Sequence, residues 1–282
     1  CYAYREKYDT ETEFEFGQRV ANELEVTIDQ LGSQNVMAFV AEPVVGATLG
    51  AVPAVDGYFK TIREICNRNG VLLILDEVMC GMGRTGTLFA YEQEGIAPDI
   101  VCIAKGLGAG YQPIGATICT DKIYAAIKNG SGFFQHGHTY LGHPMAAAAA
   151  NAVLDVLLND NILKNVNNSG DYLKDTLRAK FAQHAHVGDI RGRGLFYGLE
   201  IVQDRESKEP FPLSYGIARK IKSVAKDKGL LCYPMSGTVD GKKGDHVLLA
   251  PPYIINEMEI NNLSTLLAES LDEAIESCKV RV

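Results

Sequence analysis

The sequence predicts an α/β protein, with a mostly parallel sheet in a large domain and a smaller α+β domain after it. Two observations support this fold class. Up to about residue 160, short apolar runs alternate with segments of helical spacing, as in a parallel sheet covered on both faces by helices. Beyond that point, helix-like segments surround short strands of mixed polarity. We therefore expect a large domain over residues 1–159 and a small domain over residues 160–282.

Four apolar runs are the expected strands of the large domain. Short, continuously apolar runs that stop at polar residues are typical of buried strands. The first stops at Glu42-Pro43, the second at Asp76-Glu77 and the third at Lys105. The four runs are residues 36–41 (VMAFVA), 71–75 (VLLIL), 100–104 (IVCIA) and 114–119.

Capping residues mark the helices between these strands. Asp56 is expected to cap a helix that Gly70 ends, because apolar residues between them recur at helical spacing. Asp121 and Gly130 bracket a short helix. Pro144 suits the first position of an Ala-rich helix that ends the large domain.

The small domain is expected to contain three helices and three short strands. Asn256 and Glu259 form a variant of the capping box at the start of its last helix. The expected helices are residues 163–184, 214–228 and 256–278, and the expected strands are residues 195–201, 230–233 and 246–250.

Composition is that of an ordinary globular protein that acts on small molecules. The chain of 282 residues is 46% hydrophobic and 22% charged, which allows a sizeable core. A net charge of −8, with no basic run longer than Lys242–Lys243, argues against a nucleic-acid partner. No apolar run approaches the roughly 20 residues of a membrane span, so no membrane partner is expected. The seven cysteines form no CxxC pair, which favours reduced thiols in the cytoplasm.

Three polar residues stand at the ends of expected strands, where ligands of parallel sheets bind. Lys105 is followed by glycines that let the backbone pass close to a bulky group. A lysine amine can attack a carbonyl and hold it as an imine. Asp76 could hold a proton on a pyridine nitrogen and keep that ring an electron sink. Glu42 stands at a third strand end, so we expect all three at one site.

Each of these residues also has a simpler interpretation. Lys105 could be an exposed lysine at a strand-to-loop junction, and Asp76 could cap the turn that follows it. The glycine-rich KGLGAGYQPIG also matches a dinucleotide-binding loop. That fingerprint must open a helix, whereas Gln112-Pro113 leads directly into an apolar strand.

A polar cluster precedes the Pro144 helix. The histidines at 136, 138 and 143 suggest a metal, but their spacing fits neither a helical pair nor a known zinc pattern, so we expect no metal. The Thr139 hydroxyl beside His138, with free N–H groups in a turn, is better suited to a phosphate. A polar loop without a ligand is the alternative.

Five stretches together resemble the class III (omega) aminotransferases, which have the pyridoxal-phosphate fold type I. The order and spacing of these stretches are similar to the family's over nearly the whole chain. They are AEPVVGATLGA (41–51), LILDEVMCGMGRTG (73–86), PDIVCIAKGLGAGYQPIGA (98–116), HTYLGHPMAAAAA (138–150) and RGRGLFYGLE (191–200).

The resemblance implies a role for each matching residue. Lys105 would form the Schiff base with pyridoxal 5'-phosphate and move the proton at the substrate's α-carbon. Asp76 would pair with the ring nitrogen, and Val78 would pack on the ring. Thr139 would bind the cofactor phosphate, usually that of a neighbouring subunit, which implies a homodimer with shared active sites. Glu42 would lie near the substrate.

The implied reaction is transamination between an amine or amino acid and a keto acid such as pyruvate. Other pyridoxal-phosphate chemistry on the same scaffold (a racemase, epimerase or decarboxylating enzyme) and a truncated non-catalytic subunit are the alternatives. Family members usually have a long further N-terminal segment, which this chain lacks. Many also have a carboxylate-binding Arg before the C-terminal Pro motif, where this chain reads HVLLAPPYII, so Arg191 or Arg193 is a candidate for that role.

Overall fold

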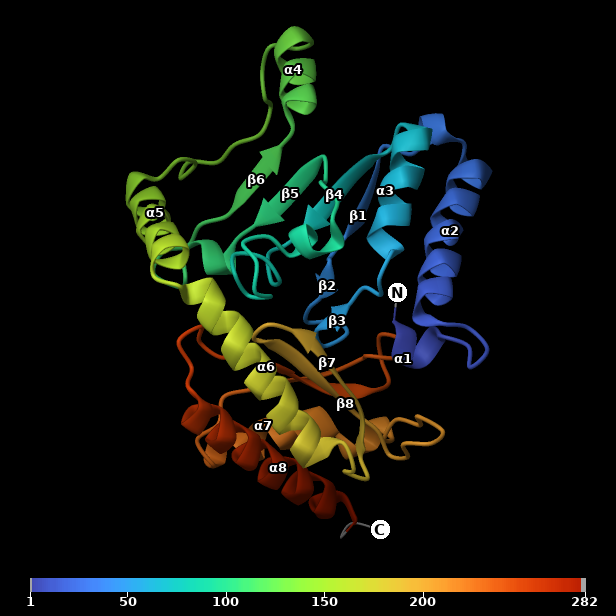
Figure 1. Cartoon of the computed structure of the whole chain (residues 1–282), viewed down its shortest axis with the longest axis vertical. Helices are drawn as coiled ribbons and strands as arrows, with labels where there is room; N and C mark the ends of the chain where they lie inside the picture. Colours follow the sequence, from blue (N-terminus) through green and yellow to red (C-terminus); the bar gives the residue numbers. More distant parts are fainter. Residues whose placement is uncertain (1, 280–282) are drawn as a thin grey trace.

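The computed structural model describes residues 2–279 and contains two separate four-stranded sheets (Figure 1). The first sheet belongs to the N-terminal half of the chain and the second to the C-terminal half. A two-stranded ribbon of β2 (Val44–Val45) and β3 (Val52–Pro53) forms a third, small sheet. Helices α5 (Pro144–Asn159) and α6 (Ile162–Phe181) follow one another from the first sheet to the second (Figure 1).

The first sheet has the strand order β1-β4-β5-β6. The expected parallel pairing holds for three strands, whereas β6 runs antiparallel to β5 and forms one edge. All four expected apolar runs form strands: three are shorter than their runs, and β4 has the expected length but begins one residue later. The strands are β1 (Ala38–Ala41), β4 (Leu72–Asp76), β5 (Ile100–Ile103) and β6 (Ala116–Cys119).

Helices α2 (Glu13–Leu31) and α3 (Tyr58–Asn69) pack together against this sheet (Figure 1). The end of α3 at Gly70 is confirmed, because Gly70 takes the left-handed φ of +68° that caps a helix C-terminus. The expected Asp56 cap is wrong. Gly57 occupies the cap position with a φ of +84°, and because glycine has no side chain, the N-terminus has no side-chain cap.

Only one face of the first sheet is deeply buried. Leu73 and Leu75 have no exposed surface, and Val101 and Ile103 on the same face are 5% exposed. Side chains of the opposite face are only partly buried or exposed, and Val40 is 61% exposed. The expectation of a sheet covered on both faces is therefore wrong within residues 2–279, where helices cover the first face alone.

The second sheet is antiparallel, with the strand order β7-β8-β10-β9. Three helices pack on it around Leu173, Leu177 and Leu267, each at most 1% exposed. The strands are β7 (Val187–Arg193), β8 (Phe196–Ile201), β9 (Tyr233–Ser236) and β10 (Asp245–Leu249), and the helices are α6, α7 (Ile217–Asp227) and α8 (Glu257–Lys279).

The expected helices of this half are all present, and so are two of its three expected strands. The expected strand at residues 230–233 is wrong, because β9 begins at Tyr233 and the preceding Leu231 is 88% exposed. The capping box of α8 is confirmed: each of Asn256 and Glu259 accepts the other's backbone N–H at 3.0 Å.

Helix α4 (Asp121–Asn129) and the segment that joins it to α5 extend away from the rest of the chain (Figure 1). Helix α4 begins at Asp121 and ends at Gly130 as expected, but contains no buried residue. Pro144 is the first residue of α5, and the His143 ring accepts the Ala146 N–H at 3.3 Å as the cap of that helix. Among the described residues, no helix is long and apolar enough to span a membrane.

Candidate active site

Strand register brings Glu42, Asp76 and Lys105 to one edge of the first sheet. Ala41 pairs with Leu75, so the next residues on the two strands, Glu42 and Asp76, are neighbours. Asp76 in turn pairs with Cys102, three residues before Lys105. All three follow the carboxyl ends of parallel strands, which is where such sheets bind ligands.

Glu42 is half-buried at this edge, and its Oε2 accepts the Gly46 N–H at 2.9 Å. Burial raises the pKa of the Glu42 carboxyl above its ordinary value, although the Gly46 hydrogen bond acts against this. The Asp76 carboxylate raises the pKa of Glu42 further, and the Lys105 ammonium lowers it. Asp76 and Lys105 therefore both lie close enough for their charges to act on the Glu42 carboxyl, which supports their expected gathering at one site.

Asp76 has one oxygen occupied by the backbone and one oxygen available. Its Oδ1 accepts the N–H of Val78 at 2.9 Å, which is the turn-capping bond of the simpler interpretation. Its Oδ2 accepts no hydrogen bond from any described residue. The Oδ2 atom of Asp76 can therefore still accept a hydrogen bond from a protonated group. The Val78 side chain lies half-buried beside it.

Lys105 combines an exposed amine with an unusual backbone. Its side chain is exposed, and the Nζ forms no hydrogen bond or ion pair with residues 2–279. Its φ of +40° lies in the left-handed region, which costs a non-glycine residue about 1–3 kcal/mol. Strain of this kind persists where the surrounding structure imposes it, often at a functional site.

The glycine-rich run after Lys105 does not open a long helix. Residues Lys105–Leu107 form a single 3₁₀ turn, η3, and the chain then continues through a loop to β6. A Cβ at Gly108 would lie 2.6 Å from the Gln112 carbonyl oxygen, so a side chain is excluded there. Gly108 thus serves close backbone packing, and the dinucleotide interpretation has no structural support.

Thr139 and His138 lie in the exposed segment between α4 and α5. No hydrogen bond among the described residues joins either side chain to Glu42, Asp76 or Lys105. The structure therefore gathers the three strand-end residues, while the expected phosphate contacts remain on an open surface. Large apolar side chains are exposed around them: Phe133, Phe134, Tyr140, Leu141 and Met145 are each at least 62% exposed.

Neither Arg191 nor Arg193 is available for a substrate carboxylate, so that suggestion is wrong. Arg191 is 8% exposed and donates to Glu200, to Asp189 and to the carbonyl oxygens of Leu49 and Gly50. Arg193 pairs with Glu94 at 2.5 Å. The charges of both guanidinium groups are therefore paired with acids of the chain itself.

Glu77 is a further buried acid that the sequence analysis did not single out. Its side chain has no exposed surface, and its two oxygens accept the N–H groups of Ala90 and Tyr91 at 2.7 and 2.8 Å. Burial raises its pKa to about 7 despite these bonds. Strand alternation gave a signal for this residue, because the neighbour of Asp76 must face the opposite side of the sheet.

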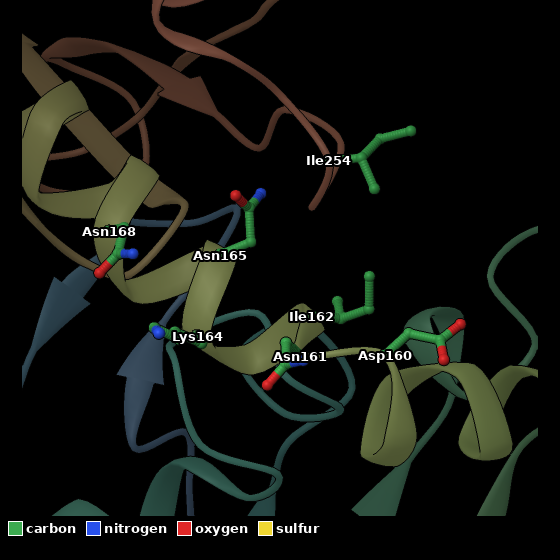
Figure 2. Close-up of a pocket in the computed structure, with 7 residues that line it drawn as sticks. All are labelled: Asp160, Asn161, Ile162, Lys164, Asn165, Asn168 and Ile254. Carbon is green, nitrogen blue, oxygen red and sulfur yellow. The ribbon is translucent and has the colours of Figure 1, made fainter.

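Two cavities lie elsewhere in the chain. One, of about 390 Å³, opens at the start of α6 (Figure 2). The other, of about 490 Å³, lies between the N-terminal segment and β7. Neither cavity is lined by Glu42, Asp76 or Lys105, so strand-end geometry and not cavity size identifies the candidate site. The first cavity is lined by Asp160, Asn161, Ile162, Lys164, Asn165, Asn168 and Ile254 (Figure 2).

The chain is similar to known aminotransferases over most of its length. The chain is 46% identical over 269 residues to an aminotransferase of Gibberella zeae, covering 95% of this chain and 53% of that protein. It is 37% identical over 266 residues to the vanillin aminotransferase of Capsicum frutescens, covering 93% of this chain and 56% of that protein. The chain thus spans little more than half the length of these relatives.

Solved structures give the same result. A thermostable (S)-enantioselective omega-transaminase from Thermomicrobium roseum superposes with a TM-score of 0.87 at 38% identity, covering 98% of this chain and 59% of that one. A transaminase from a study of ancestral reconstruction superposes with a TM-score of 0.90 at 34% identity, covering 98% and 60%. The family profile described as aminotransferase class III matches residues 2–271, and the chain therefore belongs to the class III aminotransferases.

Proposed function

We propose that the full-length protein transfers an amino group from an amine or amino acid to a keto acid such as pyruvate, with pyridoxal 5'-phosphate as cofactor. The observation that supports this most directly is the pair of Lys105 and Asp76. The amine of Lys105 has no partner among residues 2–279, and Asp76, which lies near enough to act on the same Glu42 carboxyl, keeps one oxygen available.

The residues present fit this cofactor. The exposed Lys105 amine can hold an aldehyde carbon, and Asp76 can accept the N–H of a protonated ring, with Val78 beside it to contact the ring face. When bound, pyridoxal phosphate supplies an electron sink for the charge that develops at the substrate's α-carbon. Lys105 would then move the proton at that carbon, because its side chain reaches the site from a fixed backbone.

Glu42 is proposed to contact the substrate. Its carboxylate is half-buried at the same strand edge, and only the Gly46 N–H donates to it among the described residues. A carboxylate in this position can orient a cationic group of a donor, or pair with an arginine when no such group is present.

A homodimer with shared sites is the proposed assembly. Five exposed apolar side chains in residues 133–145 support it, because a patch of this kind on a soluble protein usually marks an interface. Thr139 lies within this surface, so its hydroxyl could reach the cofactor phosphate of a second copy. A mixture of the inactive variants K105A and T139V tests the sharing. Activity that appears after subunit exchange supports it, and continued inactivity contradicts it.

We also propose a domain boundary and a cellular location. A domain boundary between residues 159 and 160 is supported by the end of α5 at Asn159 and by the two separate sheets on either side. A cytoplasmic location is supported by the cysteines at 66, 80, 102, 119, 232 and 278, which are all free thiols.

The proposed function is tested by covalent trapping and by product analysis. Borohydride reduction of the full-length protein with pyridoxal phosphate, followed by peptide mapping, should place the label on Lys105. The exposed Lys122 provides a matched control, since K122A should keep the label at Lys105 and K105A should lose it. Label on other lysines would overturn the assignment. Products from an amine donor and pyruvate then separate transamination from racemisation or decarboxylation, which would use the same two residues.

A further inference from the structure

Two residues with left-handed backbones adjoin Gly106. Lys105 precedes it in the chain, and Met82 packs against it from another loop. Lys105 has a φ of +40°, and Met82, in the loop after β4, has a φ of +53°. A Cβ at Gly106 would lie 2.9 Å from the Met82 Cβ and 3.5 Å from its carbonyl oxygen. The loop of Met82 therefore packs directly against the residue that follows Lys105, and the position of one constrains the other.

Tyr253, from the segment after β10, reaches this contact. Its hydroxyl donates to the Met82 carbonyl oxygen at 2.9 Å and lies 3.4 Å from the place of a Cβ at Gly106. Met82 is 2% exposed, so this bond is protected from water. The hydroxyl of a residue from the C-terminal half is thus the polar contact that holds the strained Met82 backbone against Gly106.

The Tyr253 ring is itself held by Arg84, a residue of the loop after β4 that bonds to the C-terminal half. The Arg84 guanidinium lies over the ring, 4.4 Å from its centroid, and donates to the carbonyl oxygens of Leu195 and Pro251 at 3.0 and 2.6 Å. Asn165 of α6 donates to the Tyr253 carbonyl oxygen. The position of Tyr253, and with it that of the Lys105 turn, therefore depends on the turn before β8, on α6 and on the segment after β10.

We propose that Tyr253 is a positioning residue for Lys105, acting through the Met82 carbonyl and Gly106, which rests on the proposed role of Lys105. Without the hydroxyl, Met82 can relax from its left-handed conformation, and the turn Lys105–Leu107 loses the surface that holds it. The Lys105 amine is then held less precisely at the carbon atom with which it must react. Small displacements of a reacting group slow a reaction greatly. Tyr253 forms no hydrogen bond with Glu42, the residue proposed to contact the substrate, so we expect substrate affinity to change little.

The variant Y253F removes only the hydroxyl oxygen, and Y172F is its matched control. Tyr172 lies on α6 and likewise has a single side-chain hydrogen bond, from Asn261 at 2.8 Å. In full-length protein freed of cofactor, we expect Y253F to speed amide hydrogen exchange in residues 104–109 and to change the rate at which acetic anhydride modifies Lys105. With cofactor restored, kcat should fall roughly tenfold while KM stays within about twofold. Y172F should match the parent protein in all four measurements.

The outcomes separate this proposal from the proposed function. Parent-like exchange, Lys105 reactivity and kcat in Y253F would overturn the positioning role. A uniform increase of exchange over the whole chain would also overturn it, because it indicates a general loss of stability. The two measurements without cofactor report on positioning even if the parent protein proves not to be a transaminase, and that result would instead overturn the proposed function.

Discussion

Arg191 and Glu200 form an ion pair with 2.7 Å between Nη2 and Oε2, and the Glu200 side chain has no exposed surface. The same guanidinium donates to the carbonyl oxygens of Leu49 and Gly50, in the loop that follows Glu42 and Gly46. The Glu200 carboxylate also accepts from Tyr2 and from Arg5. The pair thus joins the second sheet to the loop of the candidate site and to the N-terminal segment.

Breaking this pair should destabilise the protein strongly. R191M leaves the buried Glu200 carboxylate with fewer partners and the Leu49 and Gly50 carbonyls without donors. We expect a loss of about 3–5 kcal/mol in the free energy of unfolding, measured by urea denaturation. The Glu200 carboxylate also pairs with Arg5, so the triple variant R5M/R191M/E200L, which removes all three of these charges, should lose less than R191M. R219A, at an exposed position of α7, is the control and should change stability by at most about 0.5 kcal/mol. Equal losses in R191M and R219A would contradict the argument.

Asp76→Asn should remove most of the activity without unfolding the protein. The amide keeps the shape of the side chain and can still accept the Val78 N–H, but it no longer stabilises a proton on a ring nitrogen. We expect a fall in kcat of about 10²–10⁴-fold. Steady-state rates with an amine donor and pyruvate measure it, beside D155N at an exposed position of α5 as control. A D76N variant with parent kcat would mean that Asp76 only caps its turn.

Parts of the fold were predictable because their signals are local. The continuous apolar runs of β1, β4 and β5 predicted buried parallel strands, and strand ends then predicted where Glu42, Asp76 and Lys105 would meet. Helix α2 was missed because only Phe16, Gly17, Ala21 and Ile28 are buried along its 19 residues, although Thr12 and Glu15 form a capping box at its start.

Other features depend on residues that are distant in the sequence. The strand β7 reads VGDIRGR, and its polar residues are explained only by partners on other elements. The role of Arg191 was misassigned for this reason, since neither Glu200 nor the Leu49 carbonyl can be recognised as its partner from the sequence. The positive φ of Lys105 and Met82 likewise arises from packing that no local pattern reveals.

Gly198→Ala should displace the loop that Arg191 holds. A Cβ at Gly198 in β8 would lie 1.9 Å from the Gly50 carbonyl oxygen, and a backbone atom cannot move aside as a side chain can. We expect a loss of about 1–3 kcal/mol in unfolding free energy, with faster hydrogen exchange in residues 46–51. The control is Gly229→Ala, where φ is +87° but no atom lies within 4 Å, so that only backbone strain is added. If both variants showed faster exchange in residues 46–51, backbone strain at the distant Gly229 would be enough to loosen this loop. That result would contradict the steric explanation.

His246 should make the protein less stable as pH falls below neutrality. Its ring has no exposed surface, packs on Gly50 and bonds to Thr238 Oγ1 at 2.7 Å. Burial lowers its pKa to about 4, and the Arg191 charge acts in the same direction while Glu200 opposes it.

In the unfolded chain His246 takes up a proton near its ordinary pKa of about 6.5, whereas the folded protein resists protonation until about pH 4, so unfolding is favoured progressively between these values. This residue alone should cost about 2 kcal/mol of stability between about pH 7 and pH 5. H246N, which can keep the bond to Thr238 but does not titrate, should lose correspondingly less over that interval in urea denaturation. H136N, at an exposed position, should keep the parent's pH dependence. If H246N and the parent lost stability equally, the acid sensitivity would have to arise from other groups.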